Sequence, residues 1–190
     1  MRSAIYHLCK NPQHMKKLQA ELDAAQSEGN LSEMITYAEA IKLPFLGAVI
    51  KEAMRVHPSI CLTYPRHVPE GGREICGYYF AAGCRVGVNP YVIHYDTSIF
   101  GEDAEVFDPE RWFRPNAKNM ESHMFQFGNG SRTCIGKNIA LSEVYKFIPQ
   151  FFRVFDVRQE DPSKLWKEHN TWFVKQTGID VKLAKRNVAA

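Results

Sequence analysis

The residue types most able to do chemistry in this 190-residue sequence lie in one short segment, residues 127–136. Its fixed positions read F-x-x-G-x-R-x-C-x-G and are Phe127, Gly130, Arg132, Cys134 and Gly136. An apolar run with helical spacing follows, so we expect Cys134 at a helix N-terminus, where unpaired N–H groups and the helix dipole favour a thiolate. The glycines would let backbone amides turn toward the sulfur.

The neighbours of this cysteine indicate what it would hold. Gly136 would leave room for a flat, bulky group at the first helical turn, Arg132 would pair with an anionic group on it, and Phe127 would cover its face. A thiolate ligand, an arginine for carboxylates and an aromatic cover are together typical of a haem pocket. The alternative is that Cys134 is a small buried apolar residue, as free cysteines often are. The surrounding glycines and arginine favour the haem pocket.

Composition and the other cysteines argue against several other classes of protein. The net charge of +3 is too small to predict a nucleic-acid or acidic-membrane partner. The apolar runs are far shorter than the roughly 20 residues of a spanning helix, and the first residues carry no secretory signal. The cysteines are odd in number and form no C-x-x-C pair, so neither a disulfide framework nor a zinc site is indicated: Cys9, Cys61, Cys76, Cys84 and Cys134. A reducing compartment is the simpler interpretation.

The elements that must position Cys134 are read from periodicity and from turn residues. Helices are predicted over residues 12–28, 36–41 and 44–57, short strands between 62 and 88, and one long ordered loop over 95–133. A helix with a bend at Pro149 follows the loop and runs to Phe155. Two strands with a turn at Gly178 end the chain. The fold class is therefore mixed, mainly α with small β-sheets.

Two further motifs give the sequence a close resemblance to the cytochrome P450 family of haem-thiolate monooxygenases. Glu52 and Arg55 form the family's E-x-x-R on the helix before the strands, and residues 109–112 read P-E-R-W, with Arg111 as the arginine. The resemblance implies that these three residues form a charged structural triad that locks the long loop onto the helix. It also implies that Arg66 lies near a haem propionate, although a surface arginine beside a strand is the commoner case.

The resemblance covers about residues 10–180, and the tail is most similar to fungal members related to pisatin demethylase. It implies the C-terminal part of the P450 fold, with haem b (iron protoporphyrin IX) bound through the Cys134 thiolate as metal ligand and catalytic centre. The implied reaction inserts one oxygen atom from O2 into a small organic substrate, with electrons from NADPH through a reductase. Residues 59–63 and the turn at 175–178 match regions that contact substrate; an ordinary hairpin is the alternative for the latter. Eukaryotic members usually reside at the endoplasmic reticulum membrane, which implies an intracellular site.

The sequence also departs from the family pattern. It contains no [AG]-G-x-[DE]-[ST] segment, where family members handle protons for dioxygen activation, and residues 2–8 resemble only the last turns of that central helix. We therefore expect residues 1–190 to be a single partial domain, without the N-terminal half and membrane anchor of the family. Two functions remain open: a monooxygenase or its C-terminal fragment, and a non-catalytic haem-binding remnant or interaction module.

Overall fold

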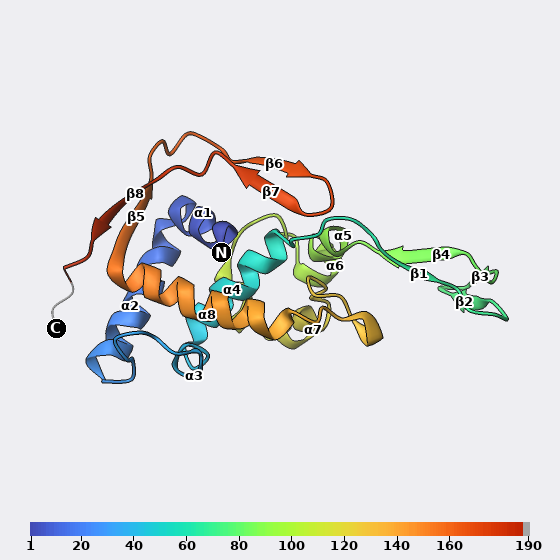
Figure 1. Cartoon of the computed structure of the whole chain (residues 1–190), viewed down its shortest axis with the longest axis horizontal. Helices are drawn as coiled ribbons and strands as arrows, with labels where there is room; N and C mark the ends of the chain where they lie inside the picture. Colours follow the sequence, from blue (N-terminus) through green and yellow to red (C-terminus); the bar gives the residue numbers. More distant parts are fainter. Residues whose placement is uncertain (188–190) are drawn as a thin grey trace.

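The computed structural model describes residues 1–187, which fold mainly into helices with small antiparallel sheets (Figure 1). The helical elements are α1 (Arg2–Lys10), α2 (Pro12–Ser27), α3 (Tyr37–Ala40), α4 (Pro44–Val56), α5 (Pro90–His94), α6 (Thr97–Phe100), η1 (Pro109–Phe113), α7 (Ala117–Ser122), η2 (Gly130–Arg132) and α8 (Lys137–Val154). The strands are β1 (Tyr64–His67), β2 (Arg73–Ile75), β3 (Tyr78–Phe80), β4 (Arg85–Val88), β5 (Phe155–Gln159), β6 (Lys167–Asn170), β7 (Val174–Thr177) and β8 (Val181–Lys185). The predicted fold class is confirmed.

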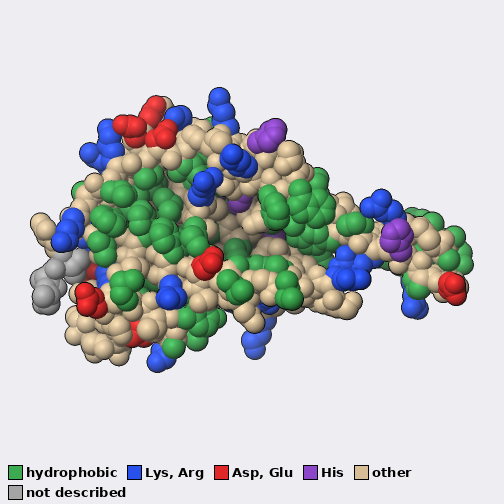
Figure 2. Space-filling view, in the orientation of Figure 1, with side chains coloured by type: hydrophobic (Ala, Val, Ile, Leu, Met, Phe, Trp, Pro, Cys, Tyr) green, Lys and Arg blue, Asp and Glu red, His purple; other side chains and the backbone are tan. Residues whose placement is uncertain are grey.

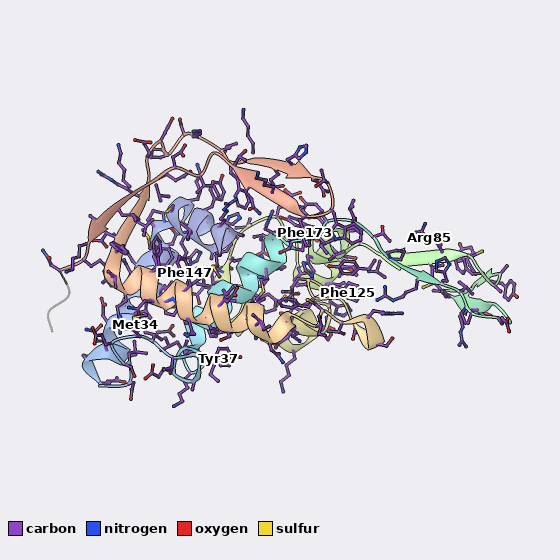
Figure 3. The ribbon with its side chains drawn as sticks, viewed as in Figure 1. Met34, Tyr37, Arg85, Phe125, Phe147 and Phe173 are labelled. Atoms are coloured by element: carbon purple, nitrogen blue, oxygen red, sulfur yellow. The ribbon has the colours of Figure 1, made fainter. Side chains whose placement is uncertain are left out.

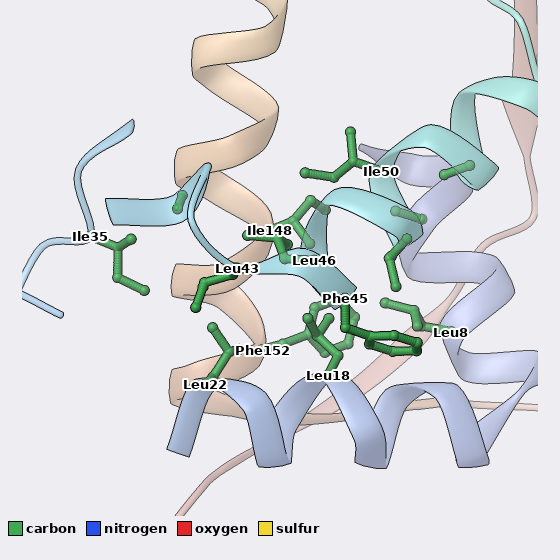
Figure 4. Packing of buried hydrophobic residues seen from close by; sticks show 14 of the residues in the cluster. Leu8, Leu18, Leu22, Ile35, Leu43, Phe45, Leu46, Ile50, Ile148 and Phe152 are labelled. Carbon is green, nitrogen blue, oxygen red and sulfur yellow. The ribbon is translucent and has the colours of Figure 1, made fainter. Parts of the chain in front are cut away.

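The core lies where α2, α4 and α8 meet (Figure 4). Leu18, Leu46 and Phe152, one from each helix, are fully buried there. Burying such a side chain stabilises a fold by about 1.5–3 kcal/mol. The N-terminus of α4 is tied to α2 because the Glu21 carboxylate accepts hydrogen bonds from the amides of Phe45, at 2.7 Å, and of Leu46, at 2.8 Å. This places α4 firmly against α2, with α8 packed across both.

The strands between α4 and α5 form an arm that extends away from the helices (Figure 1). β1 pairs with β4 along the arm, and β2 pairs with β3 at its tip, both antiparallel. Tyr78 and Tyr79 at the tip are 72% and 71% exposed. No helix in residues 1–187 combines the length and the apolar character needed to cross a bilayer.

The predicted helices over residues 12–28, 36–41 and 44–57 match α2, α3 and α4, but the predicted loop over 95–133 is wrong in part. That segment contains α6, η1, α7 and η2, which are short helical turns. Local capping explains them: Asp96 accepts from the amide of Ser98, and Asp108 from that of Glu110. The turns are too short to give a helical period. The helix after the loop, α8, continues as one assigned element through Pro149.

The predicted turn at residues 175–178 also needs correction. Lys175 lies inside β7, which pairs with β6, and the tip of that hairpin is formed by residues 171–173. Gly178 does turn the chain, with φ of +80°, but β8 then pairs with β5 rather than with β7. β6 consists of four polar residues, K-E-H-N, all of them exposed, so the alternation of apolar and polar residues from which strands are predicted is missing.

Candidate functional site

The structure brings together the three charged residues that the sequence groups as a triad. Glu52 and Arg55 lie one turn apart on α4, with Arg55 Nη2 2.7 Å from Glu52 Oε1 and Arg55 Nε 2.9 Å from Oε2. Arg111 of η1 reaches the same carboxylate, its Nε 3.4 Å from Oε1. All three side chains are 0% exposed. Since a buried charge is costly unless it is paired, each of them depends on the others.

The Glu52 carboxylate has further donors from the segment around η1. The amide of Asp108 donates to Oε1 at 3.0 Å, and Trp112 Nε1 donates to Oε2 at 3.1 Å. One carboxylate thus gathers an amide, an indole and two guanidinium groups, which satisfies its lone pairs inside the fold. These contacts attach the segment around η1 to α4.

The two buried arginines extend the same attachment to backbone carbonyls. Arg55 Nη1 donates to the carbonyl oxygens of His94, at 2.8 Å, and of Ala104, at 2.6 Å. Arg111 donates to the carbonyl of Phe100 and to Asp103. Hydrogen bonds from Arg114 and Arg111 hold the pKa of Asp103 well below its usual range. The triad is therefore the centre of a network that orders residues 94–114.

The segment from Phe127 to Gly136, here called the cysteine loop, leaves Cys134 exposed two residues before the Gly136 that precedes α8. The amide of Cys134 donates to the carbonyl of Phe127 at 2.8 Å, which closes the loop on itself. Gly128 and Gly130 have φ of +69° and +70°, a region that disfavours any residue with a Cβ. A Cβ placed on Gly136 would have the Cys134 Sγ as its nearest neighbour, at 3.9 Å. The glycines thus shape the loop and leave space beside the sulfur.

Tyr64 lies against the cysteine loop, and the sequence analysis does not single it out. Its hydroxyl donates to the carbonyl of Gln126 at 3.4 Å, and its ring is 5.6 Å from that of Phe125. Burial raises the pKa of Tyr64, and negative charge on the Cys134 sulfur raises it further. In the sequence, only its position directly before Pro65 and Arg66 indicates that Tyr64 lies near the site.

The two arginines predicted to bind propionates are both exposed. Arg66, on β1, donates to the carbonyl of Pro65, and Arg132 lies at the end of η2. Within residues 1–187, neither has an acidic partner within salt-bridge distance, whereas Arg55, Arg111 and Arg114 all do. Their charge is therefore free to meet an anionic group.

A cavity of about 600 Å³ lies between α4, α8, the start of α1 and the β6–β7 hairpin. Phe127 of the cysteine loop lines it, together with Met54 of α4 and Val144 of α8. Ser59 and Lys175, one from each predicted substrate-contacting region, both line it. The amide of Val174, the residue before Lys175, donates to the carbonyl of Ser59 at 2.9 Å. Figure 2 shows apolar side chains around a hollow on this face, and Figure 3 labels Phe173, which lines the cavity from the β6–β7 hairpin.

Comparison with known proteins decides the family. A family profile described as Cytochrome P450 matches residues 1–183. This chain belongs to the cytochrome P450 family. The P450 monooxygenase gsfF of Penicillium aethiopicum is 42% identical over 189 residues, which cover 99% of the chain and 38% of that relative. Pisatin demethylase of Fusarium vanettenii is 41% identical over 175 residues, covering 92% and 34%. The predicted resemblance is confirmed.

The P450 chain spans half or less of the length of the curated relatives described here. Besides the two above, the P450 monooxygenase ACRTS1 of Alternaria alternata is 40% identical over 189 residues, covering 98% of the chain and 50% of the relative. The matched part of the P450 fold includes the triad, the cysteine loop and α8.

The residues present fit the haem that the P450 family implies. The Cys134 sulfur is exposed, Gly136 leaves open the space that a Cβ would fill beside it, and Phe127 connects the loop to an apolar cavity. Arg66 and Arg132 offer two uncommitted cations for carboxylates. A soft sulfur ligand suits iron in such a site.

Proposed function

We propose that this P450 chain forms the haem-binding part of a monooxygenase in which the Cys134 thiolate would be the protein ligand to iron. The observation that carries the proposal is an exposed sulfur on a loop that closes on itself through the 2.8 Å bond from Cys134 to Phe127. Haem held there would supply the chemistry that inserts one oxygen atom from O2 into an organic substrate.

Other residues of the chain bind and orient. Arg132 and Arg66 would pair with the haem carboxylates, since a guanidinium keeps its charge at any working pH and its fork matches a carboxylate. Phe127 would contact the haem, and the space beside Gly136 would leave room for it. Glu52 and the two buried arginines take no part in chemistry; they keep the loop in one position.

The proposed substrate is a small organic molecule bound in the cavity beside Ser59 and Lys175, which both line it. The lining is largely apolar, with Met54, Phe173 and Val174 among its members, so it favours an apolar body over a charged one. Electrons would come from NADPH through a reductase. The relatives' name as monooxygenases supports this reaction class.

The carbon monoxide spectrum of the reduced haem protein tests the proposal. Thiolate ligation gives a strongly red-shifted Soret band, which Cys134→Ser should abolish. Cys84→Ser is the matched control, because Cys84 is also an exposed free thiol but lies on the arm. Loss of the band in the first variant and its retention in the second support Cys134 as ligand. The reverse result would assign the iron to another cysteine.

The alternative function is a non-catalytic haem-binding remnant or interaction module, and exposed apolar side chains on α8, which are typical of an interaction surface, support the interaction role. Ile139 and Phe147 of this helix are 68% and 41% exposed, and Phe147 shares a second cavity with Met34 (Figure 3). Substrate oxidation assayed with a reductase separates the two functions. A thiolate spectrum without turnover would assign the chain a haem-binding role only.

A further inference from the structure

His94, at the end of α5, is a fully buried side chain to which the motif analysis assigns no role. It is 0% exposed, and both of its ring nitrogens have partners. Nδ1 lies 3.0 Å from the carbonyl oxygen of Arg55, and Nε2 lies 2.8 Å from the amide nitrogen of Phe125. A carbonyl can only accept and an amide N–H can only donate, so the ring is neutral with its proton on Nδ1.

These two bonds join the triad to the entrance of the cysteine loop. Arg55 is a member of the triad and returns a bond from its guanidinium to the carbonyl of His94 at 2.8 Å. Phe125 lies two residues before the loop, and its carbonyl accepts from the amide of Gly128 at 2.9 Å. The bond from Cys134 to Phe127 continues the series. Within the described residues, hydrogen bonds joined by short stretches of backbone thus lead from buried Glu52 to the backbone amide of Cys134.

We propose that His94 is a positioning residue that fixes the cysteine loop to α4 through the amide of Phe125. The imidazole acts as the acceptor at that amide and as the donor at Arg55, a combination that needs the neutral ring. Burial supports this form by lowering the pKa of His94 to about 4. That this positioning holds Cys134 in place to ligate iron rests on the proposed function. The positioning of the cysteine loop by His94 does not.

Two substitutions separate the bonds of His94. His94→Asn places an amide near the position of Nδ1, so it keeps a donor for the Arg55 carbonyl but does not reach Phe125. His94→Gln carries its amide farther and can again accept from Phe125. Tyr95→Phe is the matched control, since the Tyr95 hydroxyl also bonds α4, at 2.9 Å to the carbonyl of Val56, and has no bond to the loop.

Hydrogen exchange of the complete chain without haem tests the positioning directly. We expect the amides of Phe125 and Cys134 to exchange about tenfold faster in His94→Asn, with partial recovery in His94→Gln and no change in Tyr95→Phe. The amide of Phe152, in the core of α8, should exchange at its original rate. Equal acceleration at all amides, or no change at Phe125, would overturn the proposal.

Two more readouts keep the inference separate from the proposed function. Nitrogen chemical shifts of the unmodified chain should show His94 neutral and protonated on Nδ1 at pH 7; a proton on Nε2 would overturn the proposal without any variant. With haem bound, His94→Asn should lose the thiolate-type carbon monoxide band faster than Tyr95→Phe. If the unmodified chain gave no such band, the proposed function would fail, and the exchange data would still decide the role of His94.

Discussion

Trp112 Nε1 of η1 lies 3.1 Å from Glu52 Oε2, a fully buried carboxylate oxygen on α4. The same oxygen also accepts a hydrogen bond from Arg55 of α4. The contact of Trp112 with Glu52 joins two segments that are 60 residues apart in the sequence. The Glu52 carboxylate thus holds α4 and the segment around η1 together. The stability of the cysteine loop should depend on that group more than on any surface ion pair.

Glu52→Gln should therefore lower the free energy of unfolding by about 3–5 kcal/mol, because it leaves two buried guanidinium groups without their counter-charge. Urea denaturation followed by circular dichroism measures the change. Lys182→Ala is the control, because it removes only an ion pair between Lys182 and Glu160, whose two side chains are 53% and 57% exposed. Exposed pairs contribute roughly 0–1 kcal/mol. Equal effects of the two substitutions would show that the triad does not carry the attachment.

Two glycine substitutions should act in opposite directions. Gly130→Ala should destabilise the chain by about 1–2 kcal/mol, because φ of +70° disfavours a Cβ although no atom lies within 4 Å of it. Gly47→Ala, inside α4, should stabilise by about 0.5–1 kcal/mol, since its Cβ would meet only the Tyr145 hydroxyl at 3.5 Å. Thermal melting distinguishes them. A stabilising Gly130→Ala would contradict the left-handed geometry of the loop.

Arg132→Ala should weaken haem binding while leaving the thiolate-type spectrum of the remaining holoprotein intact. The reason is that Arg132 would bind a propionate and would not bind the iron. Titration of haem into the apoprotein measures the affinity, with Arg85→Ala on the arm as control (Figure 3). Unchanged affinity in Arg132→Ala would remove Arg132 from the site.

Acid should destabilise the chain over a defined range. Burial lowers the pKa of His94 from 6.5 to about 4, so between these values the unfolded chain binds a proton that the folded chain does not. The stabilising contribution is complete above pH 6.5 and is lost as the pH falls to about 4. The loss from this one group amounts to roughly 3 kcal/mol.

Denaturation at several pH values measures this dependence, and His94→Asn should reduce the slope between pH 6.5 and 4 without abolishing it. His7, whose pKa is also lowered to about 4 by burial, would remain as a second source of the same dependence. An identical slope in the variant and the unmodified chain would show that His94 is not buried as a neutral ring.

The sequence predicts those parts of the site in which a motif and a periodic element coincide. Glu52 and Arg55 lie on a helix with a clear apolar stripe. Gly128 and Gly130, which precede Cys134, have the positive φ that glycine readily adopts. The bonds of His94 and Tyr64 were not predicted, because both contact backbone groups rather than side chains, and a backbone partner leaves no residue pattern.

The pairing of β5 with β8 and of β6 with β7 was not predicted, for a different reason. β6 consists of four polar residues, all of them exposed, so its sequence carries no alternation of apolar and polar residues. β8 pairs with β5 across more than twenty residues, and only tertiary packing selects that partner. The short turns between residues 95 and 133 depend on single capping residues, which give a local signal but no period.

The central claim is that the Cys134 sulfur ligates haem iron, and X-ray absorption at the iron edge of the haem-loaded chain tests it most directly. We predict one sulfur neighbour in the first coordination shell of the unmodified chain and of Cys84→Ser, and none in Cys134→Ser. A shell of nitrogen and oxygen alone in the unmodified chain, or a sulfur neighbour that persists in Cys134→Ser, would contradict the account.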